Sequence, residues 1–169
     1  MAAGGWPTTF LVKSRKAGWN QVYLPVRPNG ITGWVRDADV SLARDPYRVG
    51  VSLSGHTLTV WNGTHIVYRT AAGVGTRATP TPIGRFFVVM LLAQTNPTGI
   101  YGPYAFGLSA YSNVLHNFGG GIGEIGIHGT DAPSGLGSDV SHGCIRVSNR
   151  AITYLARLLP LGTPVAIGA

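Results

Sequence analysis

The sequence contains a single cysteine, which excludes an intramolecular disulfide and leaves the redox compartment undefined. It also lacks an uninterrupted apolar run of the roughly 20 residues that a helix needs to cross a bilayer, so we expect no stable membrane insertion. Residues 1–6 have neither the basic n-region nor the apolar h-region of a signal peptide. If the protein works outside the cytoplasm, we expect its export signal to have been removed or replaced in this sequence.

Charge is scarce and mostly of one sign. Only 11% of the 169 residues are charged, with 13 Lys and Arg against 6 Asp and Glu, a net charge of +7. A cationic surface attracts polyanions such as nucleic acid, anionic lipid or the acidic polymers of a bacterial wall. Apart from Lys13, Arg15 and Lys16 the basic residues are scattered, without the interleaved aromatics of a nucleic-acid surface. We therefore expect no nucleic-acid partner.

The composition favours a turn-rich β protein. Apolar residues make up 44% of the chain, and it contains 25 glycines and 11 prolines. The length suffices for one core and a small appendage. We expect a mainly β fold, a β-sandwich with one C-terminal helix, in which residues 46–169 form the principal domain and residues 1–45 a short β-hairpin appendage.

The appendage is predicted from three alternating stretches, with Asn29-Gly30 as a hairpin signal, at Thr9–Val12, Gln21–Leu24 and Thr32–Val35. About 40 residues are too few for a self-sufficient domain, so we expect this segment to pack onto the rest. It is expected to act as a structural cap, with wall binding as the alternative.

The principal domain is predicted to begin with a β-meander and to end with a helix and a last strand. The expected elements, in chain order, are the strands Arg48–Leu53, Thr57–Trp61, His65–Arg69 and Arg85–Leu92, a long irregular connection over Thr95–Gly123, a helix over Arg150–Leu159 capped by Ser148 or Asn149, and a strand over Thr163–Ile167. Tyr101, Tyr104 and Tyr111 of the irregular connection are candidates to roof a groove.

The cysteine and two of the five histidines lie within Ile127–Val147. A thiol becomes a strong nucleophile as thiolate, commonly through a nearby imidazole, and His128 and Cys144 supply that pair. The neighbouring Gly129 and Gly143 permit strained turns and close approach of a substrate. Backbone N–H groups at Gly143 and Cys144 are candidates to hold an oxyanion.

Two other readings of these residues are open. Cys144 could be a small buried hydrophobic residue, the usual state of a free cysteine. His116, His128, His142 and Cys144 are also legitimate zinc-ligand types, as in a metallopeptidase, although no spacing matches a structural zinc motif. We expect neither a metal nor another cofactor.

Two ordered motifs carry a resemblance to a known family. Ile127-His-Gly-Thr, followed by Ser141-His-Gly-Cys-Ile-Arg146, resembles the active-site signature of the L,D-transpeptidase catalytic domain, the YkuD family. Thr79-Pro-Thr-Pro-Ile-Gly-Arg-Phe86 is similar to a second motif of that domain, and the likeness covers roughly residues 47–167. Some members carry Asn where this chain has Arg146. The segment from Trp19 to Val35 resembles the last part of a bacterial SH3-like β-module.

The resemblance implies a peptidoglycan L,D-transpeptidase that cross-links peptide stems through a cysteine acyl-enzyme, acts outside the cytoplasm and is acylated by carbapenem-type β-lactams. It implies that a backbone carbonyl at Gly129 orients His128. The expected substrate-binding residues are Ser141, His142, Arg146 and Tyr104, although Ser141 is also a candidate to bond its own loop. An L,D-carboxypeptidase at the same site and a non-catalytic wall-binding module remain alternatives.

Overall fold

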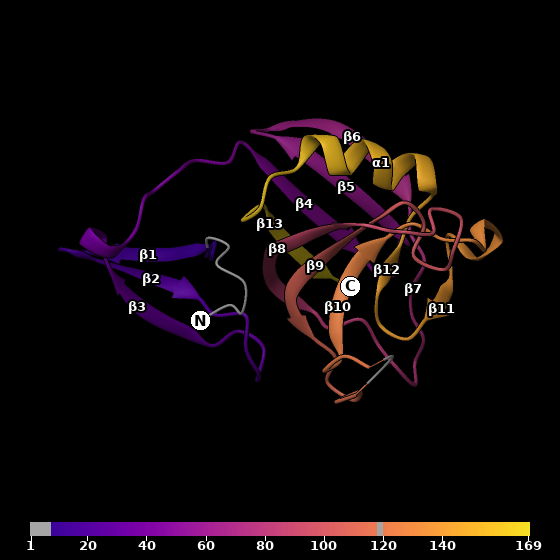
Figure 1. Cartoon of the computed structure of the whole chain (residues 1–169), viewed down its shortest axis with the longest axis horizontal. Coiled ribbons are helices and arrows are strands. Elements are labelled where there is room, and N and C mark those ends of the chain that lie inside the picture. The colour runs from indigo at the N-terminus through magenta and orange to yellow at the C-terminus, as the bar shows by residue number, and fades with distance from the viewer. Residues whose placement is uncertain (1–7, 118–119) are drawn as a thin grey trace.

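The structure is a computed structural model that describes residues 8–117 and 120–169. It is mainly β, with one α-helix among the described residues (Figure 1). The prediction for residues 1–6 lies outside this range. No helix in the described part of the chain is long and apolar enough to cross a membrane.

The N-terminal segment forms a three-stranded antiparallel sheet of β1 (Val12–Lys16), β2 (Trp19–Tyr23) and β3 (Thr32–Arg36). Each of the three predicted stretches corresponds to a strand, but the first strand begins three residues later than expected. The reason is a second tight turn between Lys16 and Trp19, where Gly18 adopts a φ of +76° that favours glycine. Every residue of β1 is exposed, so its apolar pattern is a weak signal.

The rest of the chain is built on one curled eight-stranded sheet in the order β12-β10-β9-β8-β13-β4-β5-β6. Its strands are β4 (Tyr47–Ser52), β5 (Thr57–Asn62), β6 (His65–Ala71), β8 (Gly84–Ala93), β9 (Tyr104–Tyr111), β10 (Glu124–His128), β12 (Ile145–Arg146) and β13 (Pro164–Gly168). A parallel pair of β7 (Val74–Gly75) and β11 (Asp139–Ser141) lies beside it. Two 3-10 turns occur at Asp37–Asp39 and Pro133–Gly135.

Most of the sequence-predicted elements are present within a residue or two. The exception is residues 95–123, predicted to be irregular, which contain the eight-residue strand β9. Apolar residues do recur at every second position, since Phe106, Leu108 and Ala110 are all buried. Gly107 and Ser109 between them have low strand propensity and weaken the strand signal. Strands β10 and β12 were also not predicted, because Gly126 interrupts β10 and β12 has only two residues, too few to show a period.

The helix α1 (Asn149–Leu158) closes the curled sheet. Ser148 caps it, accepting a hydrogen bond from the Ala151 amide at 3.1 Å. Its buried face, Ala151, Ile152 and Leu155, joins a core cluster drawn from both halves of the sheet. Burying an Ile or Leu side chain completely stabilises the folded state by roughly 1.5–3 kcal/mol. At the far edge Tyr154 of α1 stacks on Tyr68 of β6, with ring centroids 4.6 Å apart.

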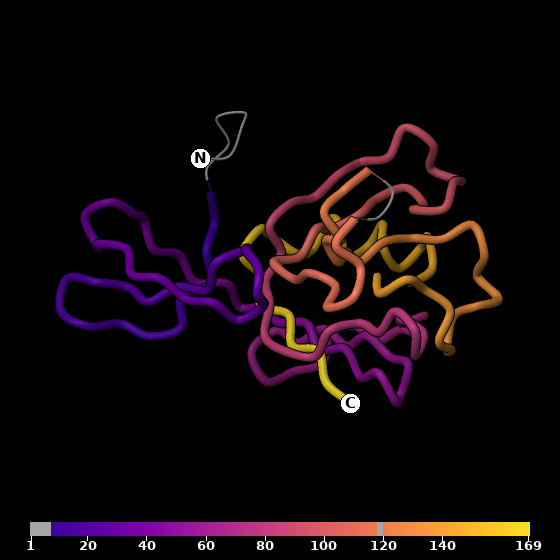
Figure 2. The backbone as a smooth tube through the Cα atoms, turned by 90° about the horizontal axis from the view of Figure 1, so that it is seen from below, coloured from indigo at the N-terminus to yellow at the C-terminus, as the bar shows by residue number. Residues whose placement is uncertain are grey.

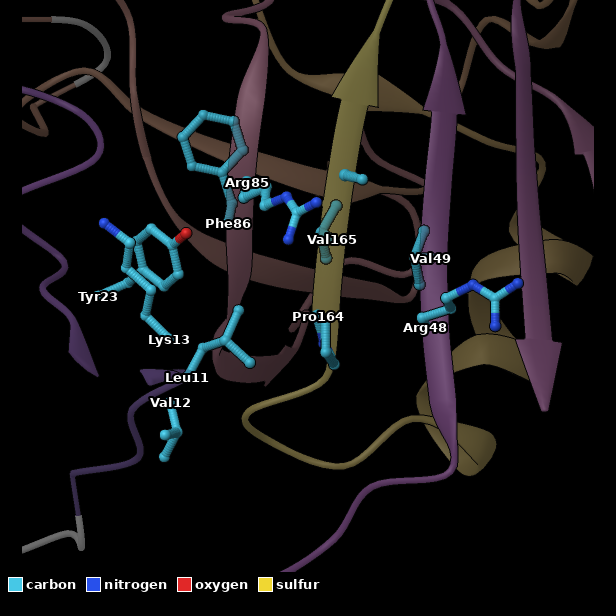
Figure 3. A pocket seen from close by; sticks show the side chains of 11 residues that line it. Leu11, Val12, Lys13, Tyr23, Arg48, Val49, Arg85, Phe86, Pro164 and Val165 are labelled. Carbon is cyan, nitrogen blue, oxygen red and sulfur yellow. The ribbon is translucent and has the colours of Figure 1, made fainter. Parts of the chain in front are cut away.

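The N-terminal sheet stands to one side of the large sheet (Figures 1 and 2). A cleft of about 360 Å³ follows the seam between them, and Figure 3 shows Lys13 and Tyr23 on one wall with Arg85 and Arg48 on the other. A second cleft of about 850 Å³ is lined by the N-terminal segment, residues 39–45 and residues 160–164. Neither lining includes Cys144 or His128.

Candidate active site

The sheet brings the cysteine and the histidine together. Strands β10 and β12 pair in parallel with Ile127 opposite Ile145 and His128 opposite Arg146. Extending that register by one residue sets Cys144 opposite Gly126, and the Gly126 amide donates a hydrogen bond to Cys144 Sγ at 3.4 Å. His128 is two residues farther along β10, so by strand geometry its side chain and that of residue 144 project from the same face, with roughly 8 Å between their Cα atoms. The register therefore places the thiol and the imidazole on the same side of neighbouring strands.

The histidine is fixed in one orientation. His128 Nδ1 lies 2.6 Å from Gly129 O, and because a carbonyl can only accept, Nδ1 carries the proton. The other ring nitrogen, Nε2, is then the basic one. The ring is 4% exposed, and Tyr101 packs edge-on against it with centroids 4.9 Å apart.

Burial keeps both groups uncharged. It lowers the pKa of His128 to about 4, a change that the Arg146 charge reinforces and the Gly129 hydrogen bond opposes. Burial also raises the pKa of the Cys144 thiol, against the lowering effects of the Gly126 hydrogen bond and the Arg146 charge. Cys144 as a residue is nevertheless partly exposed. The resting pair at neutral pH is therefore a thiol and a neutral imidazole.

Arg146 lies close enough to both groups for its charge to lower both pKa values. Its backbone is tied to Gly73 by two hydrogen bonds of 2.8 Å. Its side-chain Nε is buried without a hydrogen-bond partner, an arrangement that is costly unless another group supplies the missing acceptor. The guanidinium is thus a candidate receptor for a substrate oxygen.

The loop before the cysteine is held by Ser141. Its hydroxyl donates to Cys144 O at 2.6 Å and accepts from the Gly143 amide at 3.0 Å. Because Ser141 is 2% exposed and bonded to its own loop, the structure does not support the predicted substrate contact for this residue. The Gly143 amide, a predicted oxyanion donor, is also directed to this hydroxyl. It would have to leave Ser141 to meet an oxyanion.

The motif Thr79–Phe86 is hydrogen-bonded to the same loop. Thr81 Oγ1 accepts from the Gly75 amide at 2.9 Å and donates to Gly143 O at 2.8 Å. Thr79 Oγ1 donates to Ser141 O at 3.2 Å. The two motifs of the sequence are therefore parts of one structure. The individual role of Thr81 was not predicted, because nothing local in the sequence signals contacts 62 residues apart.

A second unpredicted residue supports the segment after His128. Asn149 Oδ1 accepts from the Thr130 amide at 2.8 Å, whereas the helix cap itself comes from Ser148. A Cβ at Gly129 would collide with this oxygen and approach Gly102 Cα to 2.9 Å. Gly129 is therefore required by close packing as well as by its carbonyl contact. The capping signal was the only trace of Asn149 in the sequence.

The other predicted residues are dispersed. Tyr101 lies against His128, whereas Tyr104 packs against the hydrophobic core and Tyr111 bonds to the N-terminal segment. A substrate contact from Tyr104 remains a prediction. His142 is exposed on the cysteine loop, and its role also remains a prediction.

The geometry does not gather a metal site within the described residues. No group of three or more His, Cys, Asp or Glu side chains among residues 8–117 and 120–169 is placed to hold an ion. His56 Nε2 lies 2.8 Å from Asp139 Oδ1, 83 residues away in the sequence.

Comparisons with known proteins confirm the family resemblance that the two motifs indicated. Residues 46–167 match the family profile described as the L,D-transpeptidase catalytic domain, YkuD. A Bacillus licheniformis protein provisionally named L,D-transpeptidase YkuD is 40% identical over 122 residues, 72% of this chain and 66% of that one. The chain thus spans just under two thirds of that relative's length.

Solved structures show the same fold. L,D-transpeptidase 3 of Mycobacterium tuberculosis is 20% identical with a TM-score of 0.55, covering 73% of this chain and 61% of that one. Bd1075 of Bdellovibrio bacteriovorus is 27% identical with a TM-score of 0.56, covering 73% and 48%. The structure of the LD transpeptidase LdtMt1 in complex with imipenem has a TM-score of 0.57 at 20% identity, covering 89% and 68%.

Proposed function

The chain belongs to the L,D-transpeptidase catalytic domain family, and from that premise we propose that it cross-links peptidoglycan through a Cys144 acyl-enzyme. The observation that carries this proposal is the strand register, which places Cys144 beside Gly126. Gly126 is two residues before His128 on the same strand. The acyl donor is a tetrapeptide stem, cleaved between a diamino acid at its third position and the terminal D-Ala. The acceptor is the side-chain amine of another stem, giving a 3→3 cross-link.

Acylation begins with proton transfer, because the resting thiol is neutral. Cys144 Sγ attacks the donor carbonyl carbon while its proton passes to His128 Nε2, the nitrogen left basic by the Gly129 contact. The new S–C bond gives a tetrahedral oxyanion. Its collapse breaks the C–N bond, and the His128 proton leaves with the D-Ala amine.

Deacylation reverses the roles of the same groups. The acceptor amine gives a proton to His128 Nε2 as it attacks the thioester carbonyl, and the returning thiolate recovers that proton. The low pKa of His128, about 4, makes the imidazolium a strong acid that does not persist between steps. Water in place of the amine would give an L,D-carboxypeptidase, which is the second candidate.

We assign the oxyanion to the amides of the cysteine loop and a substrate carboxylate to Arg146. Support for the loop assignment is the position of Gly143 directly before the nucleophile. The assignment requires the Gly143 amide to exchange its bond to Ser141 for the oxyanion. Support for Arg146 is its buried Nε without a partner beside the reacting pair. A substrate of this kind places the protein outside the cytoplasm.

Intact-protein mass spectrometry with a carbapenem tests the proposal. The wild-type protein should gain one adduct, and Cys144→Ala should gain none, since the chain has one cysteine. An unmodified wild type that still binds wall sacculi would instead support a non-catalytic wall-binding module. Muropeptide analysis with purified stems then separates cross-linked dimers from tripeptide products of the carboxypeptidase.

The role of the base has its own test. His128→Ala should slow acylation by roughly two to four orders of magnitude, the usual scale for loss of a general base. A rate near that of the wild type would remove His128 from the mechanism.

A further inference from the structure

The N-terminal sheet grips the segment that leads into β10. Arg27 Nη1 donates to Ser112 O at 2.6 Å, and Nη2 donates to Leu115 O at 3.0 Å and to Ile122 O at 2.8 Å. One guanidinium therefore joins three carbonyls on both sides of the loop 112–123. The bonds cross 85 to 95 residues of sequence.

Neighbouring residues complete this contact. The Arg27 guanidinium lies over the Tyr111 ring, 5.0 Å from its centroid, and Tyr111 Oη donates to Pro25 O at 2.7 Å. Asn29 accepts from the Tyr111 amide at 2.9 Å and donates to Tyr111 O at 2.7 Å, as a strand partner would. We call Arg27 and Asn29 the clamp.

The last carbonyl that Arg27 holds, that of Ile122, lies four residues before the amide that contacts Cys144 Sγ. Ile122 O is held by Arg27, Gly123 O accepts from the Ser112 amide at 2.8 Å, and Gly126 then donates to Cys144 Sγ. Between Glu124 and Gly126 the pairing with β9 shifts register, so the ladder alone does not fix this stretch. Gly123 also adopts a φ of +74°.

From these contacts we infer that Arg27 is a positioning residue for the active site: it sets the start of β10 and thereby the Gly126 amide against Cys144 Sγ. The N-terminal sheet is in this sense part of the catalytic unit. The inference rests on the proposed function only for its biological meaning, because the geometry at the thiol exists whatever the acyl substrate is.

The single cysteine provides a direct readout. The rate of alkylation by iodoacetamide at fixed neutral pH reports the fraction and reactivity of the Cys144 thiolate alone. A hydrogen bond to the charged sulfur is worth more than one to a neutral group. Arg27→Ala should therefore slow alkylation about three- to tenfold, and carbapenem acylation by a similar factor.

Two matched variants separate positioning from general loosening. Arg36→Ala removes an arginine of the same sheet that pairs only with exposed Asp39, and it should alkylate at the wild-type rate. Tyr111→Phe removes the hydrogen bond to Pro25 and should lower the melting temperature without changing the alkylation rate. Arg27→Lys keeps the charge but replaces the two separate nitrogens of the planar fork with a single ammonium nitrogen, so an intermediate rate is expected.

The alkylation rates of these variants decide whether Arg27 has a positioning role. Wild-type alkylation in Arg27→Ala, or equal slowing in Tyr111→Phe, would overturn the positioning role. If Arg27→Ala does not fold, the alkylation rates of Asn29→Ala and Arg27→Lys are compared with the wild-type rate instead, and a rate equal to that of the wild type in both overturns the positioning role. A wild type that alkylates readily but never acylates with a carbapenem would overturn the proposed function and leave the clamp standing.

Discussion

At the scale of the residue, the low pKa of His128 has a kinetic consequence. With a pKa near 4 the imidazole is already basic in mildly acidic solution, where an unperturbed histidine would be protonated. We expect the acid limb of carbapenem acylation to fall near pH 4 rather than near 6.5. Stopped-flow rates between pH 3.5 and 8 would show this, and a limb near 6.5 would contradict it.

The same pKa affects stability. The unfolded chain binds a proton at His128 below about pH 6.5, while the folded protein binds it only below about 4. The unfolded state therefore gains protons first, and stability is lost as pH falls through this window, by roughly 3 kcal/mol. Urea titrations of the wild type and His128→Gln should diverge between these pH values. Parallel curves would contradict the assignment.

Gly143 provides a third test at this scale. Its φ of +120° is strained for any residue with a Cβ, and that atom would lie 3.0 Å from Ile125 Cδ1. We expect Gly143→Ala to lower the free energy of unfolding by about 1–3 kcal/mol and to reduce acylation. Gly168→Ala, where a Cβ has open space, is the control and should leave both within error.

The sequence motifs pointed to Cys144 and His128 as the candidate reacting residues, but not to all the atoms that hold them. The contact between His128 and the Gly129 carbonyl was implied by the family resemblance, and the structure contains it. Gly126 was not predicted, because an amide that bonds sulfur carries no side-chain signature. Arg27 and Thr81 escaped for a related reason: their partners are more than 60 residues away. Such contacts depend on strand order.

At the scale of the element, the turn carrying Thr81 and the cysteine loop should behave as one structure. Thr81→Val leaves both the Gly75 amide and Gly143 O without their partner in a buried place. A buried unsatisfied polar group costs about 1–3 kcal/mol, so we expect the free energy of unfolding to fall by at least that amount. Thr98→Val, on an exposed loop, is the control. Denaturant curves that coincide would disprove the bracing role.

The secondary-structure elements were predicted correctly where apolar residues recur at regular spacing, and they were missed where a glycine interrupts that spacing. The meander β4–β6 and α1 have regular burial and clear caps or turns. In β10 only Ile125, Ile127 and His128 are buried, and Gly126 lies opposite Gly107 of β9. In the N-terminal sheet the first strand was predicted three residues too early, because β1 is wholly exposed and so has no apolar face to detect.

At the scale of the whole molecule, the net charge of +7 should govern attachment to anionic material. Raising salt from 0.1 to 1 M shortens the screening length from about 10 to about 3 Å. We expect co-sedimentation with anionic wall sacculi to fall steeply over that range, while sedimentation with an uncharged glycan stays low throughout. Salt-independent retention would point to a contact that is not electrostatic.

The position of β13 constrains how the chain reaches its final form. This strand lies between β8 and β4, so residues 164–168 are the seam that joins the two halves of the large sheet. During synthesis both halves emerge from the ribosome before their common neighbour exists, each with an open edge capable of wrong pairing. Because β13 is synthesised after both halves, a ribosome paused before Pro164 would hold a protein whose two half-sheets are not yet joined.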